Sequence, residues 1–189
     1  TGLTLRLSRG FAVVATTTVE PVLDPQPEHD RILSDVGAYL EEIYGALLGE
    51  SLQRLNHAVE TATGPDLSAS AGDLLRAKAG AFYAFYRDNP KELDLGFYLF
   101  DGMKPRGLTA ALNHELNERL MAALRPAQVQ LEALGLGTAE AVAETSALFA
   151  QIVGILVLNN TGRIRLFKQS PDRLFERYLE SLIARLQQS

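Results

Sequence analysis

The stretch LFAQIVGILVLNNTGRIRLFKQSPDRLFERYLESLIARL, from Leu148 to Leu186, decides the fold class of this 189-residue chain. Its first part is apolar almost all round a helix, the chain then turns through Asn-Asn-Thr-Gly-Arg, and the last part is amphipathic. A helix without a polar face has to be covered on every side. In a chain this short, a second copy of the chain would provide part of that cover. The stretch therefore predicts a helical hairpin that dimerises.

The expected dimer surface combines both helices of this hairpin. Its members are apolar or small, and they are Leu148, Ile152, Gly154, Ile155, Leu158, Phe175, Tyr178 and Leu182. Gly154 would let two helices approach closely, and Gly162 is placed as the left-handed residue that follows the first helix. Two such hairpins related by a two-fold axis would form a four-helix bundle. The alternative, in which these side chains fill a core within one chain, stays open.

The rest of the chain from Asp30 onward also has helical periodicity. Apolar residues three and four apart predict a long helix from Asp30 to about Ala62. Caps, prolines and glycines then delimit further helices. These are expected at 73–87, from Pro90 to about 100, at 108–124, at 139–158 after a Thr138 cap, and from Pro171 after a Ser170 cap. Pro126 would kink or end the helix at 108–124, and its continuation over 128–134 stays open. The predicted fold class is all-α with several helices.

Residues 1–29 differ from the helical part. Leucines alternate with polar residues in LTLRL, and FAVVATTTV is rich in β-branched residues. This pattern predicts two short strands around Ser8-Arg9-Gly10, forming a β-hairpin, or an irregular arm. Three prolines between positions 21 and 27 then predict a linker. The expected organisation is an N-terminal arm and linker over 1–29 and one helical domain over 30–189.

Composition excludes several classes of function and compartment. The net charge of −5 and the pI near 5.2 argue against a surface that binds nucleic acid throughout. The chain has no cysteine, which excludes disulfides and thiolate metal sites and favours a cytoplasmic location. The longest apolar run, 147–158, is interrupted by Gln151 and is too short to cross a bilayer. No membrane partner is expected.

No motif for catalysis or metal binding stands out. The sequence contains no His-Glu-x-x-His motif, no Glu-x-x-His motif of di-iron bundles, and no Walker loop. His114 and Glu118 lie one helical turn apart and could bind a cation together, but we favour the interpretation that they belong to a solvated helix face. The expectation is a protein that is not an enzyme and that has no catalytic residue, no metal and no cofactor.

Aromatic residues are concentrated in two groups between positions 82 and 100, which are separated by a break at Asn89-Pro90. Some of these rings would line an apolar pocket between helices, with a few polar groups to orient a ligand. The predicted ligand-binding residues are Phe82, Tyr83, Tyr86, Phe97, Phe100, Asn113 and Gln151. The alternative is that the rings simply fill the core.

The order of these pieces resembles a known family. FYAFYRDNPKELDLGFYLF (82–100) followed by VGILVLNNTGRIRLF (153–167) and a terminal amphipathic helix is similar to the C-terminal ligand-binding and dimerisation domain of tetracycline-repressor-like (TetR family) transcriptional regulators. The resemblance covers residues 30–189. It implies an effector-sensing domain that forms a homodimer and binds a small apolar or amphipathic molecule.

Regulators of this family read DNA through an N-terminal helix-turn-helix of about fifty residues. Residues 1–28 do not have that pattern, so DNA contact is expected only through a helix-turn-helix that is not present in this chain. Two other functions remain open. One is a stand-alone helical protein that binds a hydrophobic ligand and has no DNA role, and the other, less favoured, is an all-α enzyme.

Overall fold

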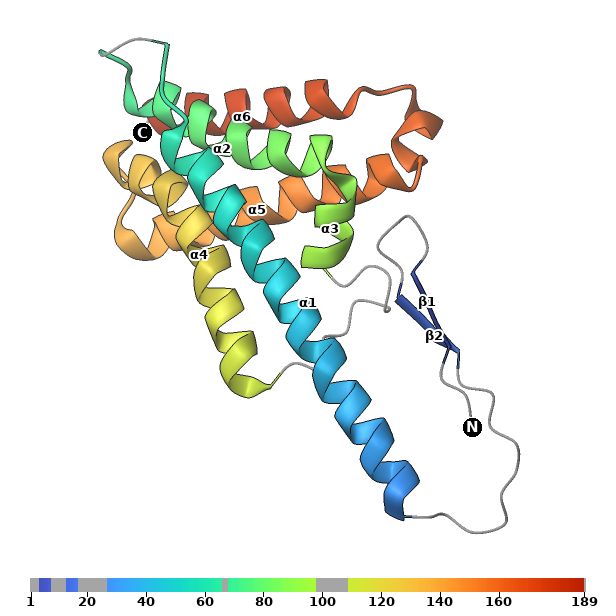
Figure 1. The fold of residues 1–189 in the computed structure, drawn as a ribbon. Coiled ribbons are helices and arrows are strands. Elements are labelled where there is room, and N and C mark those ends of the chain that lie inside the picture. Colours follow the sequence, from blue (N-terminus) through green and yellow to red (C-terminus); the bar gives the residue numbers. More distant parts are fainter. Residues whose placement is uncertain (1–3, 8–12, 17–26, 66–67, 98–108, 189) are drawn as a thin grey trace. The chain divides into compact units, whose positions relative to one another are not determined.

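The computed structural model describes residues 4–7, 13–16, 27–65, 68–97 and 109–188. The chain divides into two compact units, Thr1–Tyr44 and Gly45–Ser189, which are described separately. Helix α1 (Pro27–Thr61) begins in the first unit and ends in the second (Figure 1). It starts three residues before the predicted Asp30, because proline is well tolerated at the first position of a helix.

The first unit also contains two strands, β1 (Thr4–Leu7) and β2 (Val13–Thr16). They pair antiparallel, with Thr4 opposite Thr16 and Leu7 opposite Val13. The strands lie within the segment for which a hairpin or an irregular arm was expected.

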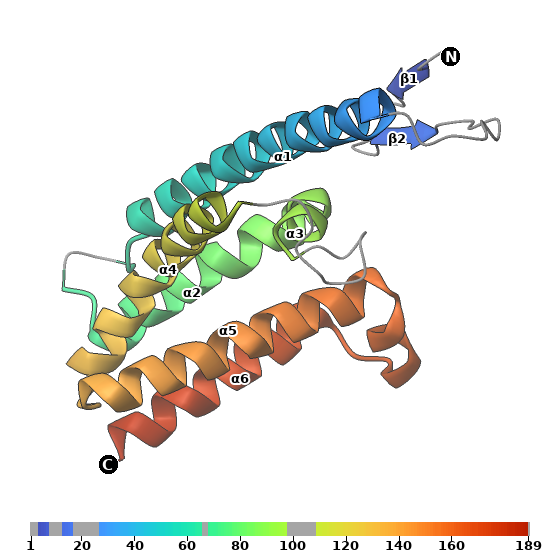
Figure 2. The ribbon, with the colours of Figure 1, turned by 90° about the horizontal axis from the view of Figure 1, so that it is seen from below.

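Every regular element among the described residues of the second unit is a helix, as the all-α prediction requires. After the C-terminal part of α1 come α2 (Ala71–Asp88), α3 (Pro90–Gly96), α4 (Ala110–Ala133), α5 (Thr138–Asn160), the short 3-10 helix η2 (Arg163–Phe167) and α6 (Pro171–Gln187). Helix α2 packs on α4 and α4 packs on α5, while α6 lies beside α5 (Figure 2). Leucines with no measurable exposure, among them Leu75, Leu131 and Leu182, form the core between these helices.

Local chemistry sets most of the helix ends. Ser70 and Asp73 form a reciprocal capping box at the start of α2, and the Ser170 hydroxyl accepts a hydrogen bond from the Arg173 amide at the start of α6. Gly162 has φ 72° and follows the last turn of α5, as predicted for a left-handed residue. The corner between the two C-terminal helices is therefore confirmed at its glycine and at its Ser-Pro start.

Two predicted helix boundaries were wrong by a few residues, while a third point had been left open. Helix α4 continues through Pro126 to Ala133, which agrees with the alternative of a continued helix and not with an end at the proline. Helix α5 begins at Thr138 with Gly137 as its cap, because the Glu140 carboxylate accepts a hydrogen bond from the Gly137 amide. Helix α3 ends at Gly96, and the expected continuation to residue 100 lies outside the described residues from position 98 onward.

Candidate functional site: the ring cluster and the outward face of α5

Four aromatic rings from three segments form a closed circuit, which we call the ring cluster. Phe82 and Tyr86 lie one turn apart on α2, Phe97 follows α3, and Phe149 is on α5. Ring centroids are 5.3 Å apart for Phe82–Tyr86, 5.6 Å for Tyr86–Phe97, 5.7 Å for Phe97–Phe149 and 5.9 Å for Phe82–Phe149. Most of these pairs meet edge to face, the favourable geometry for aromatic rings. The structure thus brings together the predicted residues Phe82, Tyr86 and Phe97.

Tyr86 is the polar member of the ring cluster. Its side chain is 1% exposed. Burial raises the pKa of the Tyr86 phenol well above its usual value, and the negative charge of Glu92 raises that pKa further. Tyr86 therefore stays neutral at physiological pH, and its hydroxyl can act as a hydrogen-bond donor in apolar surroundings.

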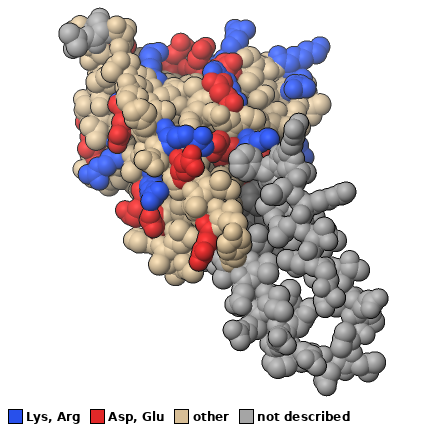
Figure 3. Space-filling view, viewed as in Figure 1, with Lys and Arg blue, Asp and Glu red and all other residues tan. Residues whose placement is uncertain are grey.

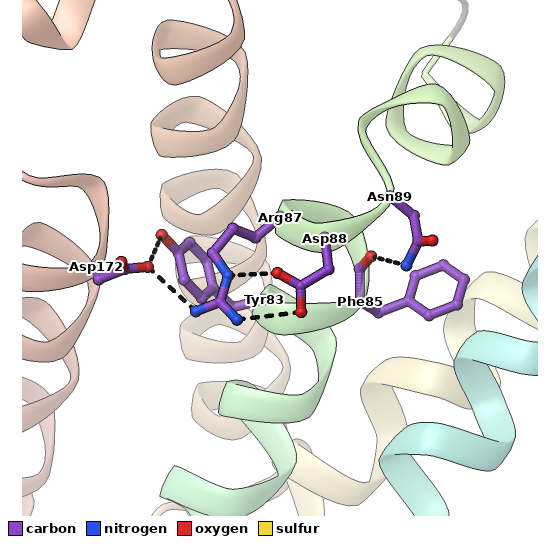
Figure 4. Close-up of polar contacts among 6 residues, drawn as sticks. All are labelled: Tyr83, Phe85, Arg87, Asp88, Asn89 and Asp172. Carbon is purple, nitrogen blue, oxygen red and sulfur yellow. Dashed lines mark hydrogen bonds and ion pairs between the residues drawn. The ribbon is translucent and has the colours of Figure 1, made fainter.

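Tyr83 is also buried, but its polar contacts are with α6 (Figure 4). Its hydroxyl donates a hydrogen bond of 2.8 Å to Asp172 Oδ1, and its ring stacks on Phe175 with centroids 4.3 Å apart and planes 6° from parallel. The Arg87 guanidinium lies 5.7 Å from the centre of the Tyr83 ring. Burial, followed by the hydrogen bond to Asp172, raises the pKa of the Tyr83 phenol. The hydroxyl that the sequence suggested for ligand orientation is engaged in a helix–helix contact.

The other predicted ligand residues are dispersed. Asn113 is half-buried on α4, and Gln151 is exposed on α5. Phe100 lies outside the described residues. Phe149 was not among the predicted ligand residues, because nothing in the sequence of α5 indicates that its ring meets Phe82 and Phe97.

The predicted dimer residues separate into two groups. Five of them, Leu148, Ile152, Ile155, Phe175 and Leu182, are at most 6% exposed and pack inside a single chain. Their side chains are already covered, as the alternative of an intramolecular core describes. Gly154 and Tyr178 are half-buried, and Leu158 is 44% exposed. The surface that a partner could cover therefore lies beside the five buried residues, at Gly154, Leu158 and Tyr178.

The outward face of α5 carries a row of residues spaced four apart, which we call the α5 row: Val142, Ser146, Ala150, Gly154 and Leu158. Val142 is 45% exposed, close to the value for Leu158, so the two largest side chains stand at the ends of the row. Open space surrounds Gly154, since a Cβ built there meets no atom within 4 Å. No member of the row is charged, and its three central residues are small.

An apolar groove of about 570 Å³ adjoins the end of the α5 row. The apolar residues that line it are Gly154, Ile155, Leu158, Ile164, Phe167 and Leu174, and the amides of Gln151 and Gln169 complete the lining. The groove thus joins the last turns of α5 to η2 and to the start of α6. Phe167 is 74% exposed, and its neighbour Leu166 is 78% exposed.

Helix α5 is the most apolar helix among the described residues. It has 23 residues and reaches a mean hydropathy of 1.9 over its most apolar window, enough by length and composition to cross a membrane. A third of that window is buried against the rest of the chain. A core helix of a water-soluble protein has the same length and composition, so this property does not by itself indicate a membrane span.

Charged residues form no evident metal site in the part of the chain that is described. Within it, no three histidine, aspartate or glutamate side chains lie close enough together to hold a metal ion. Over most of the face in Figure 3, basic and acidic side chains are interspersed.

Comparison with known proteins identifies one family. The model described as "Tetracyclin repressor-like, C-terminal domain" matches residues 75–182, more than half of the chain. That span runs from α2 into α6 and includes the ring cluster and the α5 row. Searches of curated proteins and of solved structures gave no match.

Proposed function

The chain belongs to the tetracycline-repressor-like regulators through their C-terminal domain, and from this we propose that it binds a small apolar or amphipathic effector and holds two copies of the protein together. Domains of this family are regulatory and not catalytic, which agrees with the absence of a catalytic motif from the sequence. We place the homodimer in the cytoplasm. Its contact with DNA would require a helix-turn-helix reader, which residues 1–28 do not resemble.

The α5 row is the observation that carries the dimer proposal. A two-fold axis at Ala150 would pack two α5 helices antiparallel, with Val142 facing the partner's Leu158 and Ser146 facing the partner's Gly154. Large side chains would then meet at both ends of the contact, while the small central residues would let the backbones approach closely. From Ser146 to Gly154 the central contact would extend along about 12 Å of helix, and Val142 and Leu158 would lie at its flanks because each step of four residues turns about 40° around the axis. Val142 would enter the apolar groove of the partner subunit.

The ring cluster supports the effector class. Its members are apolar except for the neutral Tyr86 hydroxyl, so it would favour an apolar or amphipathic molecule over a charged one. The rings come from α2, from the end of α3 and from α5. A molecule that separated these rings would therefore bias the arrangement of helices that also carry the dimer face.

Native mass spectrometry of the full chain as purified tests both parts of the proposed function. The expected result is a dimer of two 20.6 kDa chains that releases an apolar or amphipathic organic molecule on denaturation. A monomer at every concentration would contradict the dimer, and a bound molecule that is highly charged and hydrophilic would contradict the effector class.

Disulfide cross-linking tests the register of the two α5 helices, and the absence of native cysteines leaves no competing thiol. An Ala150→Cys variant should oxidise to a covalent dimer, because the two-fold axis brings the two Cα atoms to within about 7 Å. Ser146→Cys and Gly154→Cys should each cross-link poorly alone and efficiently when mixed. Ala122→Cys, on the exposed face of α4, is the matched control. Equal cross-linking of the control and the Ala150 variant would contradict the register.

A further inference from the structure

Helix α6 is held against α2 near both of its ends. Near the C-terminal end of α6, a Cβ built on Gly72 would lie 3.1 Å from Ile183 Cγ2, so the backbone of α2 approaches α6 closely there. At the N-terminal end, the Tyr83 hydroxyl reaches Asp172 and the Tyr83 ring stacks on Phe175. The two helices therefore run antiparallel. A close contact at Gly72 holds one end, and a polar contact at Tyr83 holds the other.

The contact at Tyr83 combines three interactions. The part-buried hydrogen bond from the Tyr83 phenol to the Asp172 carboxylate is charge-assisted and is the strongest of them. The stack on Phe175 fixes the plane of the Tyr83 ring. Arg87 Nη1 lies 3.3 Å from the same Asp172 oxygen, while Arg87 Nε lies 2.8 Å from Asp88 Oδ1 (Figure 4). The ion pairs of Arg87 are partly exposed and therefore stabilise the contact between α2 and α6 less. The Tyr83 hydroxyl is the group that stabilises this contact most.

Tyr83 stands between two features already described. Its neighbour Phe82, one residue earlier on the same helix, belongs to the ring cluster. On the side of α6, Leu174 lies next to Phe175 and lines the apolar groove beside the α5 row. If a rearrangement of the ring cluster rotated or shifted α2, Tyr83 would move with this helix. Because Tyr83 is bonded to Asp172, the N-terminal end of α6, which lines the apolar groove, would then move as well.

We propose that Tyr83 is a positioning residue that couples the ring cluster to the apolar groove through its hydrogen bond to Asp172. This inference rests on the proposed function, since it assigns Tyr83 to the link between the effector region and the dimer face. Loss of the hydroxyl would leave the stack on Phe175 in place and would leave α6 held by its close contact at Gly72.

A double-mutant cycle on the full chain tests this coupling, with the dimer dissociation constant measured by analytical ultracentrifugation. The perturbation is Phe97→Leu, which loosens the ring cluster next to Tyr86. It should change the dissociation constant by about fivefold or more when Tyr83 is present, and by less than about twofold in a Tyr83→Phe background. A purely structural role for the hydroxyl would shift the constant in Tyr83→Phe but would leave the response to Phe97→Leu intact.

Asp172→Asn provides a second way to weaken the contact, and it should also reduce the response to Phe97→Leu. Tyr39→Phe is the control, because it removes the same atom from a tyrosine that is 65% exposed. Equal responses to Phe97→Leu with and without the Tyr83 hydroxyl would overturn the coupling, as would no response in a wild-type dimer. Those outcomes leave the dimer in place, whereas a wild-type chain that is monomeric at every concentration would overturn both the coupling and the proposed function.

Discussion

Replacing Ala150 with glutamate is expected to dissociate the proposed dimer, raising its dissociation constant by roughly a hundredfold or more. The two-fold axis would set the two new carboxylates against each other at the centre of an uncharged face. Each carboxylate would lose water and would face a like charge, and neither effect has a compensating partner in the α5 row. Analytical ultracentrifugation over a range of concentrations would measure the change.

The Ala150 variant should keep its fold, because Ala150 is exposed in the single chain. Its far-ultraviolet circular dichroism should match that of the wild type. Ala122→Glu, which places the same charge on the exposed face of α4, should leave the dissociation constant nearly unchanged. Equal weakening by the two glutamates would show that net charge, and not the α5 row, controls self-association.

Phe82→Ala is expected to lower the free energy of unfolding by about 3–5 kcal/mol. Phe82 is 2% exposed and contacts both Tyr86 and Phe149, so truncation would open a cavity between α2 and α5. Urea unfolding would measure the loss. It is best performed in the Ala150→Glu background, where dimer dissociation does not contribute to the free energy.

Phe167→Ala is the matched control for this loss. The same atoms are removed from a side chain that is 74% exposed in the single chain, so the free energy of unfolding of the monomer should change by less than about 0.5 kcal/mol. A small effect at Phe82 would mean that the ring cluster is loosely packed and contributes little to the core.

The helix ends whose backbone conformation depends on a few neighbouring residues were predicted correctly from the sequence. Ser170-Pro171 starts α6, and Gly162 takes the left-handed conformation after α5, because capping and steric preference act over one turn. The sequence left open whether the helix ends at Pro126, and α4 continues there because packing along the helix tolerates a proline whose local effect is unfavourable. Glu140 likewise shifted the cap of α5 by one residue.

The contacts of Tyr83 could not be predicted in this way. Its acceptor Asp172 lies 89 residues further along the chain, and only the packing of α6 on α2 brings them together. The neighbouring residues Phe82 and Tyr83 show that two adjacent faces of α2 are aromatic, but they do not show which helices these two faces contact. The assignment of Tyr83 to a ligand therefore followed from residue type alone.

The inward face of α5 was hidden for a different reason. Periodicity identifies the buried side of a helix by contrast between polar and apolar residues, and α5 offers almost no contrast between Leu148 and Leu158. Packing against α4 and α6 determines which face of α5 is buried, so that Ile152 is buried and Ala150 is exposed. The predicted dimer residues consequently included the buried residues Leu148, Ile152 and Ile155 of α5 as well as part of the α5 row.

If the proposed dimer covers α5, the limited burial of this helix within one chain would make the lifetime of the protein depend on its abundance. A newly synthesised copy would present an uncharged helical surface to chaperones and proteases until it met another copy. At low expression that interval would be long and many copies would be degraded, while above the dissociation constant most would persist. The amount of active regulator would then rise more steeply than its rate of synthesis, so the response of the regulated genes would acquire a threshold before any effector is present.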